Sequence, residues 1–216
     1  MFIPWSSLIT ASKLSILFLG NSHTAVNNVP SMVEALLESD ASKRSVTVEM
    51  ITGGALEDLS GRQDVLKAVS SGRWDVIVLQ GAALSSSHKY VYSQAGAIKL
   101  AKLAKASKAR VLLYAEWPRK GWDETDYILG IYGQIAKASG AEIVPVCSAW
   151  DAALKVRSDL ELWAGDGNHS SPIRGYLAAL TIADFLGAGE SNWTPFKIDA
   201  PVVKLIRRSA RTAVRR

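Results

Sequence analysis

Residues 15–30 read SILFLGNSHTAVNNVP, an apolar run that breaks off at Gly20-Asn21-Ser22. Residues 15–19 predict a strand covered on both faces, because bulky apolar residues follow one another without polar alternation. Gly20 can adopt backbone angles that other residues avoid, so it permits a sharp turn after the strand. A serine there lies at the carboxyl end of a central strand, where open α/β sheets bind their ligands. Helix capping or a simple turn is the alternative role for this serine.

Strand and helix patterns alternate along the rest of the chain. Strands are predicted at residues 15–19, 46–51, 75–79, 110–115 and 142–146. Helices are predicted at residues 31–39, 64–71, 93–107 and 126–139, and from Pro172 to about Gly187. This alternation predicts a three-layer α/β/α sandwich around a five-stranded, mainly parallel, flavodoxin-like sheet. No linker interrupts the pattern, so a single domain over residues 1–216 is expected.

Composition limits the class of protein. With 216 residues, 48% of them hydrophobic, the chain can bury one sizeable core, and no apolar run reaches the length of a membrane span. The N-terminal segment lacks the basic start and long apolar centre of a secretory signal. We therefore expect a cytoplasmic protein, or a secreted or periplasmic one from which a signal has been removed. The single cysteine, Cys147, excludes an internal disulfide framework and is predicted to be a small core residue.

The net charge of +5 is unevenly placed, because five arginines lie within the last ten residues. A basic tail of this kind can bind nucleic acid or an acidic membrane. Residues 201–214 also predict an amphipathic helix, with Val203, Ile206, Ala210 and Ala213 or Val214 along one side. We favour the helix, with its arginines on the solvent face, and expect no nucleic-acid partner.

Two further predicted strands end in residues suited to a crevice at the sheet edge. The second is followed by Gly53-Gly54, where no side chain blocks access to the backbone N–H groups. The third ends at Gln80-Gly81, which places a side-chain amide at the same edge. If these strands flank the first, as in a flavodoxin-like sheet, both features converge on Ser22.

Asp166 and His169 lie three residues apart on a glycine-containing loop before the last large helix. A serine nucleophile needs a base to take its proton, and the base needs an acceptor to orient its ring. His23 directly follows Ser22, and neighbouring residues on a turn rarely face each other. His88 has no acid close in sequence. His169 is therefore the preferred base and Asp166 its preferred partner, with a helix-capping segment as the alternative.

Together these blocks resemble those of the SGNH hydrolases, the superfamily that includes the GDSL esterases. The resemblance begins at Gly20-Asn21-Ser22, continues at Gly53-Gly54 and ends at Asp166-Gly167-Asn168-His169. The resemblance extends from about residue 14 to the C-terminus, and the chain is similar to the GNS-type bacterial branch of this superfamily. It implies that Ser22 is the nucleophile, that His169 is the general base and that Asp166 is its partner.

The resemblance also implies an oxyanion hole formed by the backbone N–H of Ser22, the N–H of a block-two glycine and a block-three side-chain amide. Gly54 is preferred to Gly53 because it lies nearer the following helix. The usual third block is missing, and the chain reads Gln80-Gly81 there, which is similar to sialate O-acetylesterase-like members. Gln80 is therefore expected to supply the third donor.

The predicted function is hydrolysis of a short acyl ester, with acetyl preferred, on a small molecule or a carbohydrate. Residues 115–126, AEWPRKGWDETD, are the expected specificity loop. Trp117, Trp122, Trp150 and Trp163 can stack on sugar rings, although most are expected to pack in the core. Metal-ligand clusters and nucleotide-binding motifs are absent from the sequence, so no metal or cofactor is expected. The alternative function is a non-catalytic module that binds a glycan or another protein on the same scaffold.

Overall fold

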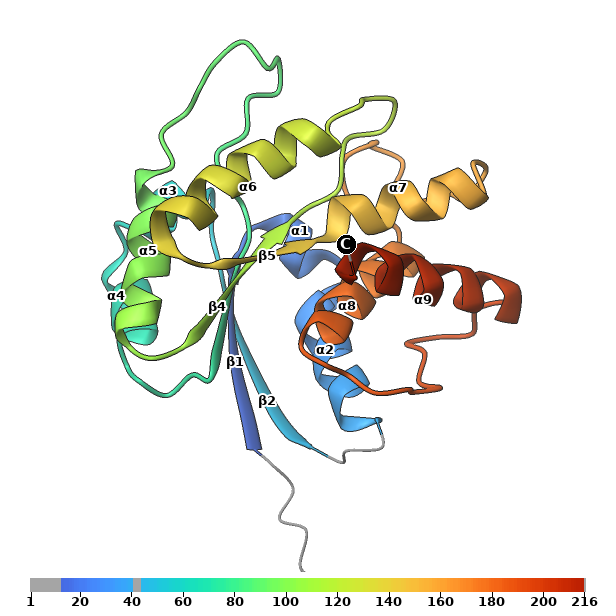
Figure 1. Cartoon of the computed structure of the whole chain (residues 1–216), viewed down its shortest axis with the longest axis horizontal. Helices are drawn as coiled ribbons and strands as arrows, with labels where there is room; N and C mark the ends of the chain where they lie inside the picture. The colour runs from blue at the N-terminus through green and yellow to red at the C-terminus, as the bar shows by residue number, and fades with distance from the viewer. Residues whose placement is uncertain (1–12, 41–43, 216) are drawn as a thin grey trace, which may run out of the picture.

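A computed structural model describes residues 13–40 and 44–215 and centres on a five-stranded parallel sheet (Figure 1). In spatial order the strands are β2 (Ser45–Thr52), β1 (Lys13–Gly20), β3 (Val76–Leu79), β4 (Arg110–Ala115) and β5 (Glu142–Pro145). This is the flavodoxin-like order, in which the connections change side at β1 and leave a ligand crevice there. The predicted strands and sheet order are confirmed.

Helices cover both faces of this sheet, and Figure 1 shows them on opposite sides of the strands. One layer is formed by α2 (Val29–Glu38), α7 (Val146–Val156), α8 (Pro172–Phe185) and α9 (Ala200–Val214). The other is formed by α3 (Leu56–Leu59), α4 (Gln63–Val69), α5 (Ala95–Ala106) and α6 (Thr125–Ser139). The predicted three-layer sandwich is therefore confirmed.

The central strand β1 shows why its apolar run has no polar alternation. Ile16 and Phe18 pack into the layer of α2 and α8, whereas Leu17 and Leu19 pack into the layer of α3 and α5. All four side chains are fully buried. Successive side chains of a strand point to opposite faces, so a strand covered on both faces needs apolar residues at every position.

The sequence missed α7, which begins directly after β5. Cys147 was predicted to be a core residue beside a strand, and the structure places it on α7, fully buried. Burial raises the pKa of its thiol to about 12, so the thiol stays protonated at neutral pH. None of the helices in residues 13–40 and 44–215 is long and apolar enough to cross a membrane.

The helix predicted at residues 201–214 is α9, and it packs against α7 and α8. Its buried side is formed by Val202, Ile206, Ala210 and Ala213, whereas the predicted Val203 is only half-buried. The three-residue and four-residue spacing of this stripe matches the helical period, because the helix has 3.6 residues per turn. Of the basic side chains of α9 and its C-cap, Lys204, Arg208 and Arg215 are exposed, whereas Arg207 and Arg211 are half-buried.

Candidate active site

Ser22 lies at the start of a short helix, α1 (Ser22–Ala25), directly beyond the carboxyl end of β1. A Cβ atom on Gly20 would clash with the Thr24 hydroxyl and the Gln80 amide oxygen, so the turn requires glycine there. The Asn21 side chain caps α1 by accepting the His23 N–H at 3.0 Å. The turn therefore presents the Ser22 side chain at an exposed position, as the sequence predicted for a serine at the sheet edge.

His169 and Asp166 lie in the loop between α7 and α8, and the structure brings both to Ser22. The His169 Nε2 lies 2.8 Å from the Ser22 Oγ, and the His169 Nδ1 lies 2.5 Å from the Asp166 Oδ2. An ionised carboxylate only accepts, so Nδ1 carries the ring proton and Nε2 is left to accept the serine proton. This arrangement can remove a proton from the Ser22 hydroxyl.

The carboxylate of Asp166 is held in place by its own loop. Its Oδ1 accepts the backbone N–H groups of Asn168 and His169, both at 2.9 Å. The hydrogen bond to His169, followed by these two backbone bonds, holds the Asp166 pKa well below its usual range. Asp166 is therefore ionised at neutral pH, and it orients the imidazole ring from a fixed position.

Two backbone N–H groups near Ser22 have no acceptor among the residues that the structure describes. One belongs to Ser22 itself, at the first position of α1, and the other belongs to Gly54. The neighbouring Gly53 N–H is already bonded to the Gly20 carbonyl at 3.0 Å. Of the two glycines, Gly54 is the one with a free N–H to offer to a developing oxyanion.

Comparison with solved structures places this fold among known proteins. A protein from Slackia heliotrinireducens, described as an SGNH hydrolase, shares 27% sequence identity, with a TM-score of 0.61 over 80% of this chain and 98% of that one. The chain belongs to the SGNH hydrolase superfamily. No family model and no curated protein sequence matches it. The narrower similarity to sialate O-acetylesterase-like members stays a prediction.

Two other structures share the fold of this SGNH hydrolase at lower identity. A DUF4886 family protein from Bacteroides uniformis is 19% identical, with a TM-score of 0.73 over 94% of this chain and 95% of that one. An acetyl xylan esterase is 18% identical, with a TM-score of 0.55 over 77% of this chain and 96% of that one. At these identities the likeness concerns the fold.

Gln80 does not lie where the sequence prediction of a third oxyanion donor requires it. Its side chain is fully buried, and its Oε1 accepts the Asn21 N–H at 3.1 Å and the Thr24 hydroxyl at 2.8 Å. A backbone N–H can only donate, so the amide oxygen must face the Ser22 turn and the amide nitrogen must point away from it. In this SGNH hydrolase Gln80 therefore stabilises the Ser22 turn through these two hydrogen bonds.

His23 and Trp117 support the loop that carries His169, a role that the sequence did not reveal. The Trp117 Nε1 donates to the Asn168 carbonyl at 2.8 Å, and the His23 Nε2 approaches the same carbonyl at 3.3 Å. Burial lowers the His23 pKa to about 4, so this ring is neutral at pH 7. His88 pairs with Glu124 at 2.8 Å and takes no part in the Ser22 arrangement.

A cavity of about 430 Å³ opens beside the Ser22 turn and includes part of the predicted specificity loop. Its wall is formed by small and apolar residues together with aromatic and charged ones, among them Asn21, Ala82, Tyr92, Glu116, Trp117, Arg119 and Glu124. Trp117 stacks on the fully buried Trp150 at 4.7 Å between ring centroids. Trp163 is half-buried and Trp122 is exposed, so the four tryptophans do not form one sugar-binding platform.

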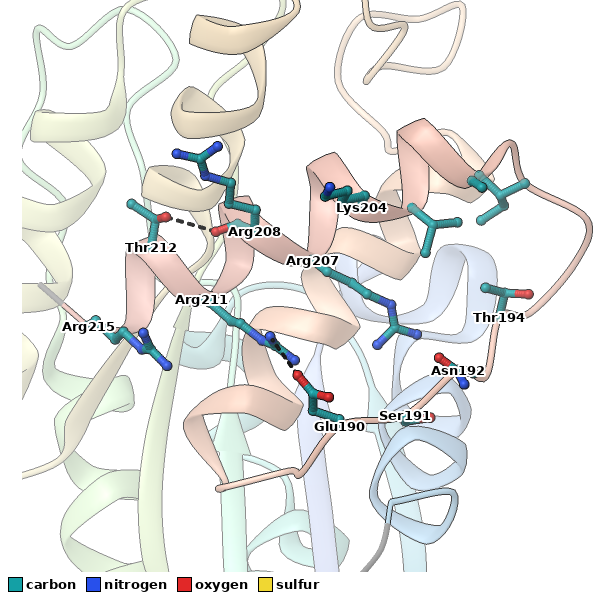
Figure 2. Close-up of a pocket in the computed structure, with 13 residues that line it drawn as sticks. Glu190, Ser191, Asn192, Thr194, Lys204, Arg207, Arg208, Arg211, Thr212 and Arg215 are labelled. Atoms are coloured by element: carbon teal, nitrogen blue, oxygen red, sulfur yellow. Dashed lines mark hydrogen bonds and ion pairs between the residues drawn. The ribbon is translucent and has the colours of Figure 1, made fainter.

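A larger concavity of about 750 Å³ lies along α9, and Figure 2 shows it between the helix and the segment that precedes it. Arg211 reaches from α9 toward Glu190, and Arg207 points toward Asn192 on that segment (Figure 2). None of Ser22, Asp166 and His169 lines it. Within the described residues, no group of three His, Cys, Asp or Glu side chains is arranged to hold a metal ion.

Proposed function

We propose that this SGNH hydrolase is a serine esterase that removes a short acyl group, with acetyl preferred, from a carbohydrate or a small alcohol. The observation that carries the proposal is the contact between His169 Nε2 and Ser22 Oγ at 2.8 Å, with Asp166 on the other ring nitrogen. An exposed serine that donates to an oriented imidazole is the arrangement that nucleophilic acyl transfer needs.

In the proposed reaction, His169 takes the Ser22 proton while Oγ attacks the ester carbonyl carbon. The carbonyl oxygen becomes an oxyanion, which the N–H groups of Ser22 and Gly54 stabilise. Collapse of this intermediate breaks the ester C–O bond, and His169 returns the proton to the departing alcohol. Water, deprotonated by His169, then attacks the acyl-enzyme and releases the acid. Asp166 stabilises the imidazolium at each stage.

The cavity beside Ser22 supports a carbohydrate as the alcohol. Its wall combines the rings of Tyr92 and Trp117 with the charged groups of Arg119 and Glu124. Aromatic faces suit the C–H faces of a sugar, and charged or hydroxyl groups suit its hydroxyls. The acetyl xylan esterase with the same fold offers a precedent for an acetylated sugar as substrate.

Hydrolysis of p-nitrophenyl acetate by wild type, Ser22→Ala and His169→Ala tests this proposal. Loss of either residue is expected to lower kcat by on the order of 10³-fold or more, because the serine and its base act as one unit. Ser70→Ala, at the exposed end of α4, is the matched control and should retain full activity. A well-folded Ser22→Ala protein with wild-type turnover would remove Ser22 from the mechanism. Acetylated xylo-oligosaccharides, compared with p-nitrophenyl octanoate, test the acyl length and the alcohol.

A further inference from the structure

In the buried hydrogen bonds next to the Ser22 turn, the donor and the acceptor of each bond are defined. The Asn21 N–H and the Thr24 hydroxyl both donate to the Gln80 Oε1, on either side of Ser22. The Gln80 amide nitrogen therefore points the other way, and its interaction with the Glu116 carboxyl group lowers the pKa of that group, against the larger effect of burial. The nitrogen is buried and completes no hydrogen bond with any described residue, Glu116 included.

The Tyr132 hydroxyl, on α6, donates to Glu116. Its hydroxyl oxygen accepts the N–H groups of Gly81 and Ala82, at 3.1 and 3.3 Å. Its proton is therefore available for the Glu116 Oε2, to which it donates. Tyr132 therefore donates to Glu116, and the Gln80 NH₂ group interacts with the same carboxyl group, because the oxygen atoms of both side chains already accept backbone N–H groups. An ionised carboxylate, which only accepts, attracts both groups, whereas a protonated one brings a third proton to the same place.

The surroundings of Glu116 leave its carboxyl group without an opposing cation. Glu116 is buried, it forms no ion pair with any described residue, and burial raises its pKa to about 7. Tyr114 on β4, Tyr132 on α6 and Cys147 on α7 face it, and burial raises the pKa of each, so all three are neutral at pH 7.

Four further titratable or charged groups line the cavity on which Glu116 lies, namely His23, Tyr92, Arg119 and Glu124. His23 is neutral there because burial lowers its pKa to about 4. Arg119 and Glu124 neutralise each other in an ion pair at 2.5 Å. Among the described residues around this cavity, Glu116 is therefore the group behind the nucleophile whose charge changes near neutral pH.

We propose that Glu116 is a positioning residue for the nucleophile. Its ionised carboxylate holds the Gln80 amide in the orientation in which the amide oxygen accepts hydrogen bonds from Asn21 and Thr24, on either side of Ser22. When Glu116 is protonated or replaced by glutamine, the Gln80 amide is free to turn over. Its NH₂ group then faces the Asn21 N–H, and two donors oppose each other. The turn loosens, and Ser22 leaves the position from which it donates to His169. This inference rests on the proposed esterase function and adds a pH-dependent control to the same site.

The pH dependence of kcat/KM separates this role from a merely structural one. Under the proposal the free enzyme needs an ionised Glu116, and burial raises the pKa of that carboxyl group to about 7. As pH falls below about 7, log(kcat/KM) is therefore expected to fall more steeply in the wild type than in Glu116→Gln, by about one further unit per pH unit.

A double-mutant cycle tests whether Glu116 acts through Gln80. Glu116→Gln is expected to lower kcat for p-nitrophenyl acetate about tenfold at pH 8 while KM changes less than about twofold. In a Gln80→Met background there is no amide to orient, so adding Glu116→Gln should change kcat by less than about twofold. Glu190→Gln, on the exposed segment before α9, is the matched control and should match wild type.

Equal effects of Glu116→Gln in both backgrounds would overturn the proposal, as would unchanged turnover in a well-folded single variant. If Glu116→Gln fails to fold by circular dichroism, the acid limb of the wild type is compared with that of Gln80→Met, in which no amide is left to orient. A wild-type slope that is steeper by about one supports the proposal, and equal slopes overturn it. Wild-type turnover by Ser22→Ala would instead refute the esterase function, so the two failures are distinguishable.

Discussion

The cavity beside Ser22 and the concavity along α9 differ in more than size. The one along α9 is the larger, at about 750 Å³, against about 430 Å³ for the cavity beside Ser22. In the α9 concavity, Arg211 pairs at 3.4 Å with Glu190, whose side chain is 91% exposed. Beside Ser22, the nucleophile, base and carboxylate are held by bonds of 2.5 to 2.9 Å, and two N–H groups are left free.

The smaller cavity is lined by Asn21, His23 and Asn168, the sequence neighbours of Ser22 and His169, so it opens beside catalytic groups that are held in place and N–H groups that are open. Exposed ion pairs such as Arg211–Glu190 contribute little, because water screens them and the side chains lose entropy. Arg207 is better anchored, since its Nη2 donates to the Tyr176 hydroxyl at 2.6 Å and to the Trp193 carbonyl at 2.8 Å. Yet no nucleophile faces a base there. A choice of candidate site by cavity volume alone would therefore select the concavity along α9, which lies away from the Ser22 arrangement.

The largest effect within this comparison is expected from Asp166→Asn. The asparagine can still accept the backbone N–H groups of its loop, but its NH₂ group would face the His169 Nδ1 and favour the wrong ring tautomer. We expect kcat for p-nitrophenyl acetate to fall by on the order of 10²-fold or more, with the fold unchanged. Steady-state kinetics with circular dichroism checks this. Wild-type turnover would leave a Ser22–His169 dyad.

Gly54→Ala should have a smaller effect on the same site. The added Cβ would clash with the Asp58 carboxylate, which accepts the Ala55 N–H at 3.0 Å and holds this turn. Displacing the turn moves the Gly54 N–H away from the oxyanion, so kcat should fall roughly tenfold to a hundredfold with little change in KM. Gly61→Ala, where the nearest atom would be 3.6 Å from the added Cβ, is the control. Unchanged kcat in Gly54→Ala would exclude this N–H as a donor.

Asp184→Asn addresses the α9 region through stability. Burial raises the Asp184 pKa from 3.8 to about 6, against the pull of Arg211, Arg207 and Arg215. The folded state therefore binds this proton more tightly than the unfolded state, and the stability that it contributes is lost as pH rises from about 4 through about 6. Asp184→Asn should raise the free energy of unfolding at pH 7.5 by ~1 kcal/mol, after allowance for screening, and should have little effect at pH 4.

Urea denaturation of wild type and Asp184→Asn at pH 4 and pH 7.5 measures this difference. Asn192→Asp, on the exposed segment facing α9, is a control that adds a carboxylate without burying it. A loss of stability at pH 7.5 that is absent at pH 4 would show instead that the ionised Asp184 carboxylate stabilises the fold through its arginine neighbours.

The smallest effect is expected from the double variant Arg208→Gln and Arg211→Gln. Both side chains line the larger concavity and belong to no group that contacts Ser22 or its loop. The kcat/KM for p-nitrophenyl acetate should stay within about twofold of wild type, because screened surface charges at this distance act weakly on a neutral ester. A tenfold loss would contradict this expectation and show that residues of the α9 concavity affect catalysis at Ser22.

The agreement between sequence and structure is best where a signal is local. The apolar run of β1, the glycine that ends it and the spacing of α9 each depend on a few neighbouring residues, and all were predicted. Helix α7 was missed because β5 runs directly into it, although Pro145, the last residue of β5 and the N-cap of α7, marks the boundary. Periodicity cannot place such a boundary when both elements are apolar.

The sequence by itself determined the fold class, the exposed serine after β1 and the short loop that carries both Asp166 and His169. Each of these follows from adjacent residues and from the rule that parallel strands end at one edge of the sheet. Only the tertiary structure decided which way Gln80 points, that Gly53 is bonded while Gly54 is free, and that Glu116 lies behind the nucleophile. The partners of Gln80 are 59 and 56 residues away along the chain, so packing sets its direction.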